Sequence, residues 1–263
     1  MKSTDTNFLK NLAADNISGS SQLLENINNW FIKNNFSYHE YEKQLKFIKE
    51  SFGDFNIIIN YAEQCEEVLQ KHGIESLKLF QRNFKNIQEK EFAELIEKSI
   101  VVLKKYDRFV TISNSKTIES VFQNLSFKKK IYVAICESRP VFEGRLLAKK
   151  LMKTNAEIKL ITEAMIPNEV EKTDAVVLGA DKYFSNGDVV NKVGSRALAL
   201  SAFVFHKAVF VITDKLKLSK KHIFESENRA KKEIWDSAPS GIKIENYYFE
   251  IIEKKFVTKL ITN

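Results

Sequence analysis

Two different spacings of hydrophobic residues divide the chain near residue 105. Before it, apolar side chains recur every three or four residues, the spacing that places them on one face of a helix. The segments predicted as helices are 20–31 with Ser20 or Ser21 as cap, 38–53, 54–73 with Asp54 as cap, and 74–103. The last segment is too long for one straight apolar stripe, so two helices or a bent one are expected. Residues 1–105 are therefore predicted to form a helical domain.

Beyond residue 105, short β-branched runs alternate with segments of helix length. The predicted strands are 108–113, 130–135, 157–162, 175–178 and 208–213, with helices over 115–125, 143–153, 166–172 and 189–206. This alternation is typical of parallel βαβ units with helices on both faces of a sheet. Residues 214–242 are predicted as an irregular excursion, followed by a strand around 244–249 and a terminal helix or strand. Residues 106–263 are therefore expected to form a Rossmann-like, three-layer α/β domain with a mainly parallel sheet.

A carboxylate stands at the end of one predicted strand. The run 175–180 leads directly into Asp181, and the turn 186–188 precedes the next predicted helix. That helix would place Asn191 and Lys192 in its first turns. In open parallel sheets, ligands bind at the carboxyl ends of the strands. This stretch is therefore the first candidate for a functional site.

Polar residues that follow other predicted strands should meet Asp181 at the same edge of the sheet. The candidates for ligand contact are Ser113, Ser115, Arg139, Glu143, Asn191 and Lys192. Arg139 is either an ion-pair partner of Glu137 or Glu143, or a ligand contact. Cys136 ends an apolar run with no histidine near it in the sequence, so it is interpreted as a small buried residue rather than an activated thiol. The four histidines are scattered, and no metal site is predicted.

The composition favours a protein of the reducing cytoplasm. The 263 residues are enough for one large domain or two modest ones. No run approaches the roughly 20 apolar residues of a membrane helix, and the first residues lack the apolar core of a secretory signal. Two cysteines make no disulfide framework. We therefore expect a cytoplasmic protein without a membrane partner.

The net charge of +7 raises the question of nucleic-acid binding. The lysines form short clusters near predicted turns, at 128–130, 215–221 and 231–232, and no stripe of basic and aromatic residues. Nucleic acid is therefore not the expected partner, and anionic metabolites or partner surfaces fit the charge better. No Gly-x-Gly-x-x-Gly occurs, so no dinucleotide cofactor is predicted, nor any other cofactor.

Three stretches of the sequence resemble motifs of one superfamily. They are Gly-Ala-Asp-x5-Gly-Asp-x2-Asn-Lys-x-Gly at 179–194, Glu-Ser-Arg-Pro-x-x-Glu-Gly at 137–144, and the loop around Ser113. The superfamily joins the regulatory alpha, beta and delta subunits of eukaryotic translation initiation factor 2B with the isomerases of methylthioribose-1-phosphate and ribose-1,5-bisphosphate. The resemblance covers 107–263 well and 22–105 poorly.

The resemblance implies roles for particular residues. In the isomerases, an aspartate and a cysteine are the proposed acid-base pair; the aspartate matches Asp181, and Ser113 stands at the cysteine position. Asn191 and Lys192 match residues that hold the ligand. Glu143 stands where the isomerases carry a substrate-contacting glutamine and where the initiation-factor subunits tend to carry glutamate. Since a serine hydroxyl is a far poorer proton donor than a thiol near pH 7, this pattern argues against ordinary turnover.

Three hypotheses follow from the resemblance. The favoured one is a protein similar to the initiation factor 2B alpha subunit, which binds a phosphorylated sugar or nucleotide without efficient turnover. The alternative is an aldose-ketose isomerase acting on a sugar 1-phosphate, with Asp181 as general acid-base and Ser113 or Cys136 in place of the missing thiol. The third is a subunit of a larger assembly with a vestigial pocket. The resemblance also implies a homo-oligomer that pairs as a dimer through 106–263, with translation factor subunits as candidate partners.

Overall fold

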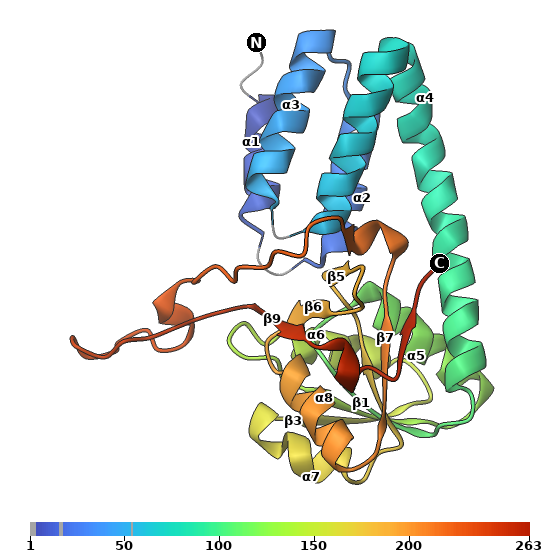
Figure 1. Ribbon diagram of the computed structural model, residues 1–263, viewed down its shortest axis with the longest axis vertical. Helices are drawn as coiled ribbons and strands as arrows, with labels where there is room; N and C mark the ends of the chain where they lie inside the picture. Colours follow the sequence, from blue (N-terminus) through green and yellow to red (C-terminus); the bar gives the residue numbers. More distant parts are fainter. Residues whose placement is uncertain (1–3, 16–17, 54) are drawn as a thin grey trace.

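The N-terminal part of the chain is helical. In the computed structural model, which describes residues 4–15, 18–53 and 55–263, its helices are α1 Thr4–Ala13, α2 Ser20–Lys33, α3 Tyr38–Ser51 and α4 Asn56–Leu103 (Figure 1). Apolar faces of α2, α3 and the first half of α4 enclose a core that includes Leu23, Phe31, Tyr41 and Tyr61. The helical periodicity read from the sequence is thus confirmed for this part.

The start of α2 differs from the prediction. Gly19 is the N-cap residue and no side chain caps the helix, so the assignment of Ser20 or Ser21 as cap is wrong. The Ser20 hydroxyl donates a hydrogen bond to Asp181 instead. The other predicted cap, Asp54, lies outside the described residues.

The segment α4 consists of two helices that meet at Gly73, where the chain folds back so that the second half runs alongside the first (Figure 1). This residue has φ 76°, in the left-handed region that glycine enters without a steric cost, and it interrupts the helix where the sequence predicts a break. The second half continues as one helix along the side of the sheet (Figure 1). Its end carries Leu95, Ile96 and Leu103 into the core on one face of that sheet. Helix α4 therefore joins the two hydrophobic cores, and the boundary at residue 105 stays a prediction.

A six-stranded, all-parallel sheet forms the second part, in the order β10-β7-β4-β1-β2-β3. The strands are β1 Arg108–Ile112, β2 Tyr132–Cys136, β3 Glu157–Ile161, β4 Ala175–Leu178, β7 Ala208–Ile212 and β10 Lys259–Ile261. One face is covered by the end of α4, α5 Lys116–Lys128 and α6 Glu143–Leu151, and the other by α7 Ile166–Val170 and α8 Ser195–Val204. The predicted three-layer α/β fold is confirmed.

A second, smaller sheet replaces the start of one predicted helix. It has the order β8-β5-β6-β9, with β5 Lys182–Phe184, β6 Val189–Lys192, β8 Leu218–Ser219 and β9 Phe249–Ile252. The prediction that Asn191 and Lys192 lie in a helix is wrong, because Val189 and Val190 pair with β5 and β9 and α8 begins only at residue 195. The predicted strand at 244–249 is also wrong, since β9 begins at its last residue.

The strand order creates a crevice between β1 and β4. After β1 the chain passes to α5 on one face of the sheet, whereas after β4 it passes to the small sheet and to α8 on the other face. Neighbouring parallel strands whose connections leave in opposite directions open a space beyond their carboxyl ends. Residues at the ends of β1 and β4 therefore face a common space.

A long irregular arm, residues 220–248, leaves the body of the molecule after β8 (Figure 1). The turn η3 Lys231–Glu233 lies within it, and at its base the Tyr248 hydroxyl and the Asn246 amide donate to the Glu233 carboxylate. The irregular excursion read from the sequence is thus observed. In the described part of the chain, no helix combines the length and apolarity needed to cross a membrane.

Candidate functional site

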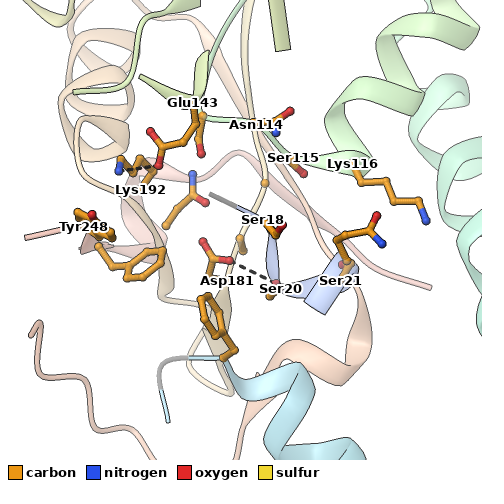
Figure 2. A pocket seen from close by; sticks show the side chains of 18 of the residues that line it. Ser18, Ser20, Ser21, Asn114, Ser115, Lys116, Glu143, Asp181, Lys192 and Tyr248 are labelled. Atoms are coloured by element: carbon orange, nitrogen blue, oxygen red, sulfur yellow. Dashed lines mark hydrogen bonds and ion pairs between the residues drawn. The ribbon is translucent and has the colours of Figure 1, made fainter. Parts of the chain in front are cut away.

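A cavity of about 560 Å³ lies at the crevice between the ends of β1 and β4. Both parts of the chain line it: the start of α2 and the loop after α3 from the helical part, and strand ends, the start of α6 and the base of the arm from the other. Its volume falls in the range of small-molecule sites. Figure 2 shows Ser20 beneath Asp181, with Glu143 and Lys192 facing each other beside them.

Six of the seven candidate residues line this cavity. They are Ser113, Ser115, Glu143, Asp181, Asn191 and Lys192. Arg139 is not among the lining residues; its guanidinium donates to the Ile234 carbonyl at 3.1 Å and lies over the Phe142 ring. The two predicted ion-pair partners of Arg139 pair elsewhere, Glu137 with Arg145 and Glu143 with Lys192, so the ion-pair interpretation of Arg139 is wrong. Its role as a ligand contact stays a prediction.

Asp181 is fixed just beyond β4 by its neighbours. Its backbone N–H donates to the Val190 carbonyl at 2.9 Å, and the Ser20 hydroxyl donates to its carboxylate at 3.4 Å. Burial raises the pKa of Asp181 above the ordinary value of an aspartate, against the opposing effects of Lys217, the Ser20 hydrogen bond and Lys192. A carboxyl group with a raised pKa exchanges its proton closer to neutral pH, as general acid-base chemistry requires.

Glu143 and Lys192 form a buried ion pair at 2.7 Å, with 8% and 2% of the two residues exposed. Close packing puts Glu143 there, because a Cβ on the adjacent Gly144 would lie 1.9 Å from the Cys136 carbonyl oxygen. Lys192 also lies over the Tyr248 ring, 4.3 Å from its centroid. Burial raises the pKa of Glu143, although Lys192 opposes the shift. The charge of Lys192 is therefore balanced before any ligand enters.

One oxygen of this pair still has no partner. The second carboxylate oxygen of Glu143 accepts no hydrogen bond from any residue that the structure describes. A buried acceptor left in this state costs about 1–3 kcal/mol. A ligand hydroxyl that donates to it would recover that energy, which makes Glu143 a candidate contact for a sugar.

Ser113 occupies an unusual backbone conformation at the end of β1. Its φ is 70°, and Ser138, which follows the neighbouring strand β2, has φ 66°. The Ser113 N–H donates to the Ser138 hydroxyl at 2.8 Å, and the Ser138 N–H donates to the Glu163 carboxylate at 2.7 Å. Left-handed conformations of residues other than glycine cluster at functional sites, where the surrounding structure holds them. This bracing fixes the loop that carries Ser113.

Ser115 and Asn191 line the cavity, and each also makes a hydrogen bond within the protein. The Ser115 hydroxyl caps α5 by accepting from the Ile118 N–H at 3.4 Å, and the Asn191 amide donates to the Ser195 hydroxyl at 2.9 Å. Cys136 is fully buried outside the lining, and burial raises its pKa. The interpretation of Cys136 as a small buried residue is confirmed, and the idea that it replaces the missing thiol loses its support.

The sequence patterns do not single out three further residues of the site. They are Ser20, Lys217 and Tyr248, which all line the cavity. Lys217 belongs to a lysine cluster, and its place soon after strand β7 is the one signal that points to it, because that strand ends at the same edge of the sheet. Ser20 and Tyr248 lie far from the other site residues along the chain, and only the fold brings them there.

The starts of two helices border the cavity. The first residues of α2 and α5, including Ser20, Ser21 and Lys116, line it. The N–H groups at the start of a helix and the positive end of its dipole attract phosphate. No group of three or more His, Cys, Asp or Glu side chains that could hold a metal ion occurs among 4–15, 18–53 and 55–263.

Comparison with known sequences identifies a family. A model of the Initiation factor 2 subunit family matches residues 24–263. The ribose 1,5-bisphosphate isomerase of Archaeoglobus fulgidus is 27% identical over 221 residues, which are 80% of this chain and 68% of that protein. The methylthioribose-1-phosphate isomerase of Bacillus velezensis is 28% identical over 198 residues, or 67% of this chain and 56% of that one. The chain thus spans between about half and two thirds of these curated relatives.

Solved structures share the fold. The translation initiation factor eIF-2B of Pyrococcus horikoshii OT3 superposes with a TM-score of 0.86 at 21% identity, covering 99% of this chain and 95% of that one. The 5-methylthioribose 1-phosphate isomerase of the same organism gives 0.79 at 17% identity, with 99% and 83% covered. The resemblance read from the motifs is therefore confirmed, and the chain belongs to the Initiation factor 2 subunit family.

Proposed function

We propose that the chain is an aldose-ketose isomerase that acts on a sugar 1-phosphate of the ribose-1,5-bisphosphate or methylthioribose-1-phosphate type. The observation that carries the proposal is the position of the Asp181 carboxyl group. It lines a cavity that is bordered by the starts of two helices, and its pKa is raised. The names of the relatives support turnover better than the binding-only hypothesis that we favour from the sequence.

The reaction needs one proton acceptor and one proton donor. Its net change moves one hydrogen from C2 to C1 of the sugar and one proton from the C2 hydroxyl to the former ring oxygen. Asp181 would accept the proton that leaves C2 and return it to C1, since its raised pKa suits repeated protonation and deprotonation. The Ser113 hydroxyl would donate a proton to the ring oxygen as the bond between that oxygen and C1 breaks, and would regain one from the C2 hydroxyl as the ketone forms. The net reaction needs no external oxidant or reductant.

The ligand would lie with its phosphate toward the helix starts. The N–H groups at the beginnings of α2 and α5 are suited to a phosphate. The sugar hydroxyls would then face Glu143 and Lys192, where an acceptor oxygen without a partner is available. Asn191 and Ser115 would complete the contacts from the lining.

Binding without turnover is the second candidate. The specific observation in its favour is the hydroxyl of Ser113 at the position where the isomerases carry a thiol, because an alcohol donates a proton poorly near neutral pH. In that case the protein would hold a phosphorylated sugar or nucleotide as the initiation-factor subunits are expected to do. Translation factor subunits stay candidate partners only under this hypothesis.

One assay separates the two candidates. The purified chain is incubated with ribose-1,5-bisphosphate or methylthioribose-1-phosphate, and ketose formation is followed by NMR. Ketose formation together with a rise in melting temperature is the result expected for an isomerase. A rise in melting temperature without ketose would favour binding alone. Neither effect with either sugar or with nucleoside monophosphates would contradict both candidates.

We also propose self-association in the cytoplasm through the sheet-containing part. Phe203 and Val204 on α8 are 61% and 66% exposed, and apolar residues exposed together mark protein interfaces. Light scattering is expected to give the mass of a dimer, and Phe203→Glu to give the monomer mass. Leu79→Glu, which changes a residue 60% exposed on α4, is the matched control and should leave the dimer intact. A monomeric wild-type chain at micromolar concentration would contradict the proposal.

A further inference from the structure

Three helices end in the same way at one edge of the large sheet. The second half of α4, α5 and α6 cover one face of that sheet, and each ends just before a strand begins, at β1, β2 and β3. An apolar side chain at each of these ends faces solvent: Val101, Phe127 and Met152 are 65%, 83% and 73% exposed. None of the three lines the cavity of the candidate site. The fold therefore brings exposed apolar side chains from three distant parts of the sequence to one edge.

Hydrogen bonds hold the three helix ends next to one another. The Lys129 ammonium donates to the carbonyl oxygens of Lys104 and Tyr106, 2.8 and 2.6 Å away, which ties the end of α5 to the end of α4. The Glu157 N–H donates to the Ile131 carbonyl oxygen at 2.8 Å, which joins the loop after α6 to the loop after α5. The three ends therefore form one surface.

Lysines surround each of the exposed apolar side chains. They are Lys104 and Lys105 after Val101, Lys128 after Phe127, and Lys149 and Lys153 on either side of Met152. All five are exposed, and none forms an ion pair with a carboxylate in the part of the chain that the structure describes. Two carboxylates of the same edge already have partners, since Asp107 pairs with Lys129 and Glu157 with Lys130. We name the three apolar residues and these five lysines the basic edge.

The composition of the basic edge fits an anionic lipid surface. A helix dipole favours lysine at a helix end, but it gives no reason for an exposed Phe or Met there. Single apolar side chains can insert between lipid headgroups, while lysine ammoniums stay level with the anionic groups. A protein partner needs a complementary shape, which single side chains on separate helix ends provide poorly. Single-stranded nucleic acid needs several rings for stacking, and Phe127 supplies the one ring of this surface.

We propose that the basic edge docks the protein on an anionic membrane, with Phe127 and Met152 inserted and the lysines bound to anionic lipid groups. The inference is independent of the proposed function. The expectation of no membrane partner rests on the missing apolar run in the sequence, and docking on a lipid surface needs no such run. The cavity lies at the opposite edge of the sheet, beyond the carboxyl ends of the strands, so a docked chain keeps its site accessible.

Sedimentation with lipid vesicles tests the inference. The full chain is mixed with vesicles of phosphatidylcholine, either alone or with about 30% phosphatidylserine. Binding is expected with the anionic vesicles only, and it should weaken as salt is raised. Lys128→Gln combined with Lys153→Gln should lower the affinity about 30-fold, since each lysine near an anionic surface contributes about fivefold. Phe127→Ser combined with Met152→Ser should lower it about tenfold or more, because the inserted apolar area is lost.

A matched variant on the helical part serves as the control. Leu79→Ser combined with Lys43→Gln changes a residue that is 60% exposed and an exposed lysine, both away from the basic edge, and should bind like the wild type. All these variants change exposed residues, so each should melt at the temperature of the wild type. They should also form ketose at the wild-type rate, which separates this inference from the proposed function.

Three outcomes would overturn the inference. The first is a wild-type chain that binds neither kind of vesicle, or both equally, and this result does not depend on any variant. The second is binding to anionic vesicles that stays unchanged in both basic-edge variants. The third is release of the chain from the vesicles by single-stranded polyuridylate at an equal concentration of phosphate, which would make the basic edge a nucleic-acid surface.

Discussion

Replacing Asp181 with asparagine is expected to lower the rate of ketose formation by about 10²–10⁴-fold, the usual contribution of one general acid-base group. Asparagine keeps the shape of the side chain and can still accept the Ser20 hydrogen bond, but it cannot take up a proton. The loss should therefore appear in kcat, with KM nearly unchanged. The measurement is NMR of the sugar at saturating concentration.

Stability provides the control for this variant. Burial raises the pKa of Asp181, so the folded chain disfavours the carboxylate, and the contribution of this group to stability is present at low pH and is lost as pH rises through its folded pKa. Asparagine carries no charge, so the melting temperature at neutral pH should not fall. Asp236→Asn, which changes an exposed residue of the arm, should alter neither rate nor melting temperature. If Asp181→Asn kept the kcat of the wild type, Asp181 would not be the general acid-base of the reaction.

The same carboxyl group predicts the pH dependence of the wild-type chain. As general base, Asp181 must be ionised, and ionisation is incomplete below a raised pKa. The rate is therefore expected to fall as pH decreases through that value. Glu143 also has a raised pKa, caused mainly by its burial, and the charge of Asp181 contributes to this shift.

The sequence predicts the parts of the site that lie at strand ends. Gly179-Ala-Asp181 after an apolar run, and Ser113 after another, are placed correctly because a parallel sheet brings the ends of neighbouring strands to one edge. The hairpin of β5 and β6 also has a local signal. Asn-Gly at 186–187 between apolar pairs is a hairpin turn, and Gly187 has the positive φ of 91° that such turns need.

Other parts of the site could not be predicted, because their partners are distant in the chain. Ser20 and Asp181 are 161 residues apart, and the bond from Asn60 to Leu216 joins residues 156 apart. No local pattern marks such pairs. The capping preference of serine pointed to a helix end for Ser20, whereas the tertiary contact with a carboxylate decides where its hydroxyl points.

Replacing Ser113 with cysteine is expected to raise the rate of ketose formation by up to about 10²–10⁴-fold. The change puts a thiol, with an ordinary pKa of about 8.5, where the wild type has an alcohol that hardly ionises. The loop should accept the cysteine. The backbone at φ 70° is held by the hydrogen bond from the Ser113 N–H to the Ser138 hydroxyl, and this bond does not involve the side chain that changes. Ser113→Ala removes the hydroxyl without adding a thiol and should not raise the rate.

Alkylation can attribute the gained rate to the new thiol. Cys65 and Cys136 are both free and buried, so iodoacetamide should leave the folded wild type unaffected and inactivate Ser113→Cys. A gain that is lost on alkylation means that the lining, the Glu143–Lys192 pair and Asp181 are already arranged for isomerisation, and that the weak donor at 113 limits the rate. If Ser113→Cys binds the sugar phosphate but turns it over no faster than wild type, the deficit lies elsewhere in the site. The carboxylate at 143, which replaces the glutamine expected of an isomerase, would then be the residue to change next, because it adds a negative charge beside Asp181 where the substrate would bind.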